Sequence, residues 1–248
     1  MVQFCWNNSG EKMIQIGNFF FKYRNWVFIP MYLAVFIPSP ELLGEDKRHW
    51  LIILGLFITI LGQAIRCLTI GLAYIDRGGK DKKVYASQLV TQGIFNHCRN
   101  PLYIGNILKL LGIAVLANSV LYLGVFIPAF LFIYQAIVLA EENFLAGKFG
   151  PDYVDYCQRV NRWIPNVAGL SDTLKSMSFR WQRPVVKEIS SIYVWLIGIS
   201  AVLLYKYPEL TNGDTALRDQ NFFISIVICT ALYLGIRHLK KIGILQGL

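Results

Sequence analysis

Six apolar segments, each close to the roughly 20 residues that a helix needs to cross a bilayer, limit most strongly how this chain can fold. They lie at 26–43, 50–75, 102–118, 119–140, 191–207 and 221–239. The 248 residues are 55% hydrophobic, which exceeds the apolar share of roughly 45–50% that is usual in soluble domains. We therefore expect an all-α, polytopic integral membrane protein with about six transmembrane helices.

The basic residues indicate which loops stay inside. Of the 24 Lys and Arg residues, 18 lie in the segments 1–25, 76–101, 141–187 and 237–241, whereas the loops at 41–49 and 206–220 hold two each. Short loops rich in Lys and Arg remain cytoplasmic. Both termini are therefore predicted to be cytosolic, in the inner (plasma) membrane if the organism is a bacterium. The formal charge of +9 is attributed to this topology and to anionic lipid headgroups, not to nucleic acid.

The loops divide the chain into four parts. Residues 1–24 mix aromatic and basic side chains and are expected to lie on the membrane surface. Residues 25–83 hold two spans and a basic loop, and 84–170 hold two polar stretches with the third and fourth spans. Residues 171–248 begin with an amphipathic inner-leaflet segment, 171–187, and end with the last two spans. No internal repeat is visible, so a transporter built from two matching halves finds little support.

Three features commonly found in other classes of protein are not expected here. The five cysteines show no C-x-x-C spacing, which predicts neither a disulfide framework nor a metal site. The N-terminus has no short apolar core followed by a cleavage motif, so no removable signal peptide is expected. The chain also lacks a G-x-G-x-x-G motif between a strand and a helix, which excludes a Rossmann-type nucleotide site.

Two polar stretches flank an apolar hairpin. The first covers 93–103 and the second 141–165, and the short break Asn118-Ser119 lies between the third and fourth spans. An out-and-back hairpin returns both stretches to the same side of the membrane, so we expect them to meet and to bring Tyr103 near Glu141. A pair of solvated cytosolic loops is the alternative.

The ends of this hairpin carry opposite chemical preferences. Asn100-Pro101 begins the third span, and the free backbone N–H groups of a first helical turn suit a carboxylate or phosphate. Glu141-Glu142 follow the fourth span, where the helix dipole disfavours negative charge unless the helix continues to Gly150 or the carboxylates hold a cation. A ligand with a cation and a carboxylate, such as S-adenosylmethionine, fits both ends, as does a zwitterionic lipid headgroup.

Three polar side chains lie inside the predicted spans. Asn106 and Lys109 share one face of the third span, and Arg66 lies at a comparable depth in the second. We expect the three to surround a pocket at the level of the headgroups and to contact the substrate. The alternative is that Arg66 and Lys109 only extend to the headgroups from within the membrane.

The spacing of residues in the two polar stretches is specific. It is carried by Leu89-Val90-Thr91, Gly93, Phe95, Arg99-Asn100-Pro101, Tyr103 and Gly105, then by Glu141-Glu142, Leu145, Phe149-Gly150, Tyr153, Tyr156 and Val160. Over about a third of the chain, 87–165, this pattern resembles the integral-membrane methyltransferases typified by isoprenylcysteine carboxyl methyltransferase, with phospholipid methyltransferases as relatives.

The resemblance implies a cytosol-facing S-adenosylmethionine site and a lipid or lipid-like acceptor that enters from the bilayer and is methylated on a carboxyl group or a headgroup amine. An amine would have to lose a proton, for which Glu142, His97 and Tyr103 are the candidates. Cofactor contacts are expected at Ser87, Gln88, Leu89, Val90, Phe95, Asn100, Pro101, Leu102, Tyr103 and Glu141.

Two positions depart from the pattern. Asn100 stands where the prenylcysteine enzymes have His, and it still donates and accepts hydrogen bonds. Ile137 stands where they have an Arg that reads the substrate carboxylate, and its loss removes a bidentate carboxylate partner. Prenylcysteine is therefore in doubt as the acceptor. A membrane reductase that uses a nicotinamide cofactor and a small transporter remain alternatives, and the sequence gives neither the acceptor nor the oligomeric state.

Overall fold

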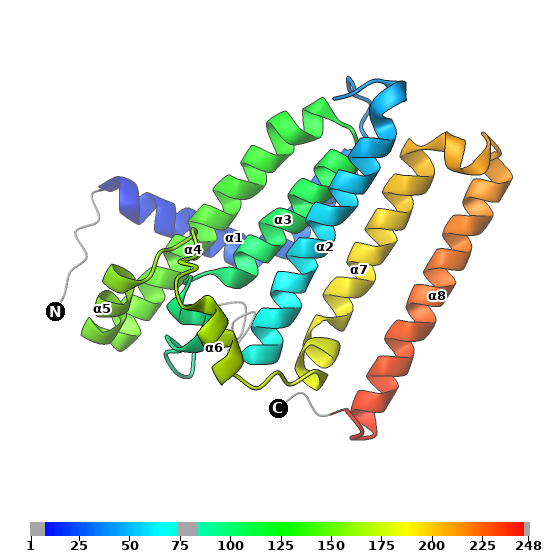
Figure 1. Ribbon diagram of the computed structural model, residues 1–248. Coiled ribbons are helices and arrows are strands. Elements are labelled where there is room, and N and C mark those ends of the chain that lie inside the picture. The colour runs from blue at the N-terminus through cyan, green and yellow to red at the C-terminus, as the bar shows by residue number, and fades with distance from the viewer. Residues whose placement is uncertain (1–7, 74–83, 246–248) are drawn as a thin grey trace.

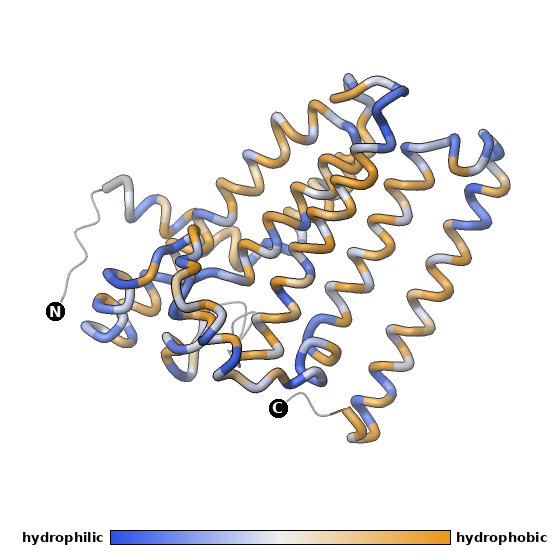
Figure 2. The backbone as a smooth tube through the Cα atoms, in the orientation of Figure 1, coloured by the Kyte–Doolittle hydropathy of each residue, from blue (hydrophilic) through white to orange (hydrophobic). Residues whose placement is uncertain are grey.

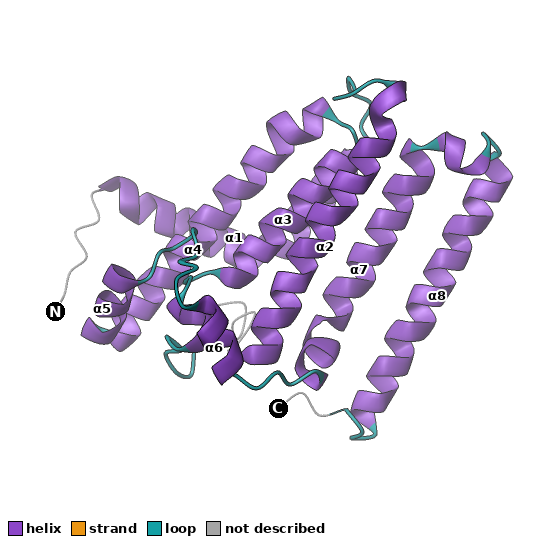
Figure 3. Ribbon diagram, viewed as in Figure 1, coloured by secondary structure: helices purple, strands orange, loops and turns teal. Residues whose placement is uncertain are grey.

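The computed structural model describes residues 8–73 and 84–245, and across these ranges it is helical, without extended strands (Figure 3). The predicted basic loop at 76–83 and the first seven residues of the predicted surface segment lie outside the described residues. The α-helices are α1 (Asn8–Leu33), α2 (Arg48–Leu72), α3 (Pro101–Leu116), α4 (Ile127–Phe149), α5 (Pro151–Arg159), α6 (Leu170–Ser176), α7 (Gln182–Lys206) and α8 (Thr215–Lys241).

Five helices stand side by side in the order α4, α3, α2, α7 and α8, and α1 crosses α4 obliquely (Figure 1). Neighbouring helices of this row run in opposite directions, so the loop before α3, helices α5 and α6, and the start of α7 gather at one end. Most of the length of these helices is apolar, and polar residues gather in the connecting loops and around α5, α6 and the start of α7 (Figure 2). This arrangement places the candidate functional residues at one end of the row.

Within the described residues, four helical segments are long and apolar enough to cross a membrane: Glu45–Leu72, Tyr122–Phe149, Gln182–Lys206 and Thr215–Lys241. They indicate an integral membrane protein. α3 is apolar but has only 16 residues, about 24 Å at 1.5 Å per residue. α1 carries Glu11, Lys12, Lys22 and Arg24, and it does not meet the same criterion. Of the six predicted spans, the first and the third therefore do not meet the length and hydropathy criterion that the other four meet.

The predicted surface segment and the first predicted span form one helix. α1 continues without interruption through position 24, where a boundary was predicted, and ends at Leu33 before a 3-10 turn at Ala34–Phe36. No residue near position 24 breaks a helix, and Pro30 lies inside α1. The helix packs along α4 through Phe28, whose ring lies 5.3 Å from that of Phe130 and 5.5 Å from that of Tyr134.

α2 and α3 approach closely through glycines. A Cβ atom added at Gly62 would lie 2.6 Å from the carbonyl oxygen of Gly105, and one at Gly112 would lie 2.4 Å from the backbone nitrogen of Thr59. Small residues allow two membrane helices to bring their backbones together. The hydroxyl of Thr59 also donates to the carbonyl of Lys109 at 3.1 Å. These contacts hold α3, whose first turn belongs to the candidate site.

The predicted hairpin is present. Asn118 adopts a positive φ of 50° between α3 and α4, and its side-chain oxygen accepts hydrogen bonds from the backbone nitrogens of Leu42 at 2.8 Å and Leu43 at 3.0 Å. A π-helical turn, Tyr122–Phe126, then leads into α4. The start of α3 and the end of α4 therefore lie at the same end of the row.

The segment 171–187, predicted to be a single amphipathic stretch, contains a break. α6 ends at Ser176 and α7 begins at Gln182. Between them Phe179 packs against the end of α2, where a Cβ atom at Gly71 would lie 2.1 Å from its ring. The backbone nitrogen of Arg180 donates to the carbonyl of Gly71 at 2.9 Å, which fixes this link to α2.

Candidate active site

A cavity of about 170 Å³ lies where α3 begins and α4 ends. A single buried water needs only roughly 10–15 Å³, so the cavity has room for a small molecule. Its walls come from α1, the segment before α3, the first turn of α3, the end of α4, and α5. The lining residues are Phe21, Val84, Tyr85, Ala86, Gln88, Leu89, Val90, Phe95, Arg99, Asn100, Pro101, Leu102, Tyr103, Glu141, Glu142, Leu145, Tyr153 and Tyr156.

The start of α3 forms one wall. Asn100 precedes the helix and Pro101 opens it, and no described side chain caps this end. The side-chain amide of Asn100 instead donates to the carbonyl of Arg162 at 3.2 Å. Because the first N–H groups of a helix have no partner within it, they add partial positive charge to the cavity wall at Leu102 and Tyr103.

The hairpin joins Tyr103 and Glu141. The Tyr103 hydroxyl donates a 2.8 Å hydrogen bond to Glu141 Oε1. α4 does not end at these carboxylates but continues to Phe149, where Gly150 terminates it with a φ of 56°. The helix therefore continues past the two carboxylates, which is one of the two alternatives expected from the sequence. Because the helix dipole acts within the last turn, it does not oppose their negative charge.

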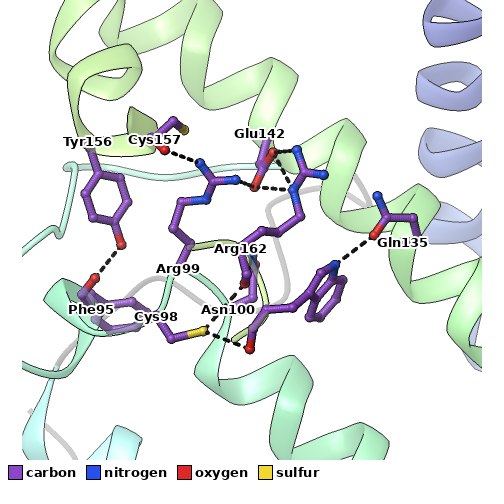
Figure 4. A network of polar contacts seen from close by, with 10 residues as sticks. Phe95, Cys98, Arg99, Asn100, Gln135, Glu142, Tyr156, Cys157 and Arg162 are labelled. Carbon is purple, nitrogen blue, oxygen red and sulfur yellow. Dashed lines mark hydrogen bonds and ion pairs between the residues drawn. The ribbon is translucent and has the colours of Figure 1, made fainter. Parts of the chain in front are cut away.

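Glu142 lies between two guanidinium groups (Figure 4). Arg162 donates to both of its carboxylate oxygens, at 2.6 to 3.0 Å, and Arg99 Nη2 lies 3.1 Å from Glu142 Oε1. Burial lowers the pKa of Arg162, but the hydrogen bonds and charge of Glu142 outweigh this and raise it. Two positive charges and one negative charge leave this cluster with a net charge of +1.

Arg99 lines the cavity and has one buried hydrogen-bond donor without a partner among the described residues. Its Nη1 donates to the carbonyl of Cys157 at 3.1 Å, and its side chain is only 10% exposed. Its Nε is buried and has no hydrogen-bond partner among the described residues. A buried donor without a partner costs roughly 1–3 kcal/mol.

α5 closes the cavity with two tyrosines. Tyr153 and Tyr156 are 3% and 4% exposed, and the Tyr156 hydroxyl donates to the carbonyl of Phe95 at 2.7 Å. Burial raises the pKa of both phenols, so they remain neutral. The tyrosines thus provide neutral aromatic surface next to charged groups, which suits a cationic ligand.

Nine of the ten residues expected to contact the cofactor line the cavity. Ser87, the tenth, lies beside this set in the chain but is not among the lining residues. Two of the three predicted catalytic residues, Glu142 and Tyr103, also line it.

His97, the third, points elsewhere. It is 5% exposed, its Nδ1 lies 2.6 Å from the carbonyl oxygen of Asn166, and its Nε2 lies 2.8 Å from the hydroxyl of Thr173. Both ring nitrogens are therefore used to hold the segment after α5 and helix α6. This geometry supports a structural role for His97 and not the predicted catalytic one.

The three predicted substrate contacts also lie away from the cavity. Arg66, Asn106 and Lys109 are absent from its lining and lie where α2, α3 and α7 pack together. Arg66 forms an ion pair with Glu188 of α7, 2.7 Å between Nε and Oε2. In place of the predicted pocket at headgroup level, these residues form a packed polar network, because α7 supplies the carboxylate of Glu188.

Some site residues escaped prediction. Phe21 lies in α1, far from the motif in sequence, and only the packing of α1 against α4 brings it to the cavity. The pairing of Arg99 and Arg162 with Glu142 was not predicted, although all three belong to the polar stretches. Glu188 had a visible signal, an acidic residue at the start of an apolar helix.

Comparison with known proteins supports the same region. Residues 50–152 match the family model described as phospholipid methyltransferase. The cobalt-zinc-cadmium resistance protein CzcN of Cupriavidus metallidurans is 27% identical over 76% of this chain and 83% of its own length. No solved structure matches.

Further relatives are named as enzymes, and two of them serve as examples. A protein-S-isoprenylcysteine O-methyltransferase of Arabidopsis thaliana is 31% identical, over 55% of this chain and 68% of its own length. The enzyme of that name from Tribolium castaneum is 28% identical, over 57% of this chain, and the chain spans about half (51%) of its length. The chain is therefore a methyltransferase and belongs to the membrane family that includes the isoprenylcysteine and phospholipid methyltransferases.

Proposed function

We propose that this protein transfers a methyl group from S-adenosylmethionine to a lipid or lipid-like acceptor that enters from the bilayer. The observation that carries the proposal is the cavity between α3, α4 and α5, whose walls include a hydrogen-bonded carboxylate, aromatic surface and the start of a helix. The Lys- and Arg-rich loops at this end of the row support a cytosolic orientation of the site, with both termini inside.

The residues present fit the proposed donor, which supplies an electrophilic methyl group when bound. The positive charge of Arg99 in the cavity wall and the free N–H groups in the first turn of α3 suit a carboxylate. Glu141 offers negative charge to a cation, and Tyr153 and Tyr156 offer aromatic surface. These groups lie on three helices and the segment before α3, so the folded hairpin aligns them before the ligand binds.

The proton acceptor for an amine substrate can be narrowed further. His97 does not line the cavity, and the carboxylate of Glu142 is engaged by two arginines. The remaining candidate is the pair Tyr103 and Glu141, which both line the cavity and are joined by the hydrogen bond from the Tyr103 hydroxyl to the carboxylate. A carboxylate acceptor needs no base, so the same site serves ester formation by alignment and exclusion of water.

Isoprenylcysteine is not the acceptor that this chain favours. Ile137, one helical turn before Glu141, is fully buried, and it gives no charge to bind a substrate carboxylate. We therefore propose a headgroup amine or another lipid-like group as the acceptor, in line with the phospholipid methyltransferase match.

Methyl-labelled S-adenosylmethionine tests the proposal. Membranes that contain the protein, and membranes that contain its Glu141→Ala variant, are incubated with the labelled donor and extracted for lipid. We expect label in a lipid from the first sample only. Label that is released as methanol by mild base indicates an ester, and label that resists base indicates an N-methyl group. Equal labelling in both samples would argue against the assigned site.

A further inference from the structure

Three charged side chains are buried where α2, α3 and α7 pack together. Arg66, Lys109 and Glu188 are 6%, 8% and 0% exposed. Charged groups within membrane helices are expensive and are usually paired and functional. None of these three residues lines the cavity, so any role in the site must come from the helices that they connect.

Arg66 connects α7 with the start of α3. Its Nε and Nη2 donate to the two carboxylate oxygens of Glu188, at 2.7 and 2.8 Å. Its Nη1 donates to Asn106 Oδ1 at 2.7 Å and to the carbonyl of Leu102 at 3.2 Å. One planar guanidinium group therefore bonds to α7 on one side and to the first two turns of α3 on the other.

The surrounding packing keeps this guanidinium in place. A Cβ atom at Gly105 would lie 2.5 Å from Cγ of Arg66, so the arginine stem passes directly over the backbone of α3. Gln63 donates to Glu188 at 3.4 Å and accepts from Lys109 Nζ at 2.6 Å. Lys109, the second cation buried between these helices, thus belongs to the same network.

We propose that Arg66 is a positioning residue for binding of the methyl donor, and that Glu188 of α7 acts through it. Leu102 is a wall residue of the cavity, and its carbonyl is the group that Arg66 holds. None of the lining residues comes from α7, and among the contacts of this helix the Glu188 and Arg66 pair is the one that leads to the wall residue Leu102. The inference rests on the proposed function.

Substitution by lysine separates charge from geometry. A lysine at position 66 keeps a positive charge for Glu188 but lacks the planar fork that reaches three groups at once. The carbonyl of Leu102 and the amide of Asn106 then lose their shared donor. A first turn that is free to shift should weaken donor binding, since misplacement of about 1 Å at a distance can reduce catalysis by about a hundredfold.

Calorimetric titration of the full-length protein in detergent with S-adenosylhomocysteine tests the inference. The proteins are wild type, Arg66→Lys, Asn106→Ala and the control Arg48→Lys. The control changes an arginine at the other end of α2, where it pairs with Glu41. We expect a Kd raised on the order of tenfold in Arg66→Lys, a smaller rise in Asn106→Ala, and no change in the control, with unchanged stoichiometry.

A merely structural role gives a different result. Misfolding lowers the stoichiometry and leaves the Kd of the folded fraction unchanged, and that outcome would overturn the inference. If Arg66→Lys does not fold, Asn106→Ala decides, because it keeps the Arg66 and Glu188 pair, and a wild-type Kd there overturns the inference. If wild type binds no S-adenosylhomocysteine, the proposed function fails and this inference fails with it.

Discussion

The hydroxyl of Tyr103 donates a 2.8 Å hydrogen bond to the carboxylate of Glu141, 38 residues away in the chain. Tyr103 lies in the first turn of α3, and Glu141 lies near the end of α4. The turn at Asn118 reverses the chain between them. Because the two residues meet only when the hairpin is folded, the cavity beside them exists only in the folded protein.

The ion-pair cluster around Glu142 should contribute strongly to stability. We expect Glu142→Gln to lower the free energy of unfolding by about 3 kcal/mol, since breaking a buried pair leaves uncompensated charge on Arg99 and Arg162. Glu41→Gln, which weakens a half-exposed pair with Arg48, should lower it by less than about 1 kcal/mol. Denaturant unfolding in detergent measures both. An equal loss of unfolding free energy in both variants would show that burial does not make the Glu142 ion pairs more stabilising than the exposed pair.

His97 should behave as a support. Replacement by Ala removes contacts to Asn166 and Thr173 and should lower the free energy of unfolding by about 1–3 kcal/mol. The pH dependence of methyl transfer should keep its shape in the variant, because His97 is not among the residues that line the cavity. Loss of one limb of the pH profile in His97→Ala would instead assign it a role in catalysis.

The buried thiol of Cys98 should make stability fall in alkali. Burial raises its pKa above the ordinary value of 9.0, against the opposing effects of the Asn100 backbone and Arg99. The folded protein therefore holds this proton more tightly than the unfolded chain. The resulting stabilisation is complete below the ordinary pKa and is lost as the pH rises through the higher folded-state value. Between pH 7 and 10 the free energy of unfolding should fall less in Cys98→Ala than in wild type. The same dependence on pH in both proteins would show that the Cys98 thiol does not contribute to the fall.

The glycine contact between α2 and α3 should not tolerate a side chain. Gly62→Ala places a methyl group 2.6 Å from a backbone oxygen, and such overpacking costs about 1–3 kcal/mol. Gly124→Ala is the matched control, because nothing lies within 4 Å of the added atom. Thermal unfolding should show a clear loss for the first variant only. A similar response to both substitutions would mean that helix propensity, not packing, sets the effect.

The sequence predicted the features of this protein that depend on local pattern. Apolar length identified the helices of the row, and the polar pair Asn118-Ser119 located the hairpin turn. The continuation of α1 through position 24 left no local signal, because a helix that packs on α4 need not change where its composition changes.

In the candidate site, too, some contacts could be predicted from the sequence and others could not. Tyr103 and Glu141 were expected to meet from the hairpin alone. The contact of Arg66 with Glu188 could not be anticipated, because the predicted span began at 191 while α7 begins at Gln182 and therefore includes Glu188 in its second turn. Two side chains 122 residues apart become partners only through the order of helices in the row.

Direct titration of the purified protein with S-adenosylhomocysteine, and separately with NADPH, tests the central claim most directly. We predict that wild type binds S-adenosylhomocysteine saturably and does not bind NADPH. In Glu141→Ala and Tyr103→Phe the affinity for S-adenosylhomocysteine should fall at least tenfold, because a charge-assisted hydrogen bond contributes about 1.5–3 kcal/mol. Binding of NADPH without S-adenosylhomocysteine, or unchanged affinity in both variants, would contradict the account.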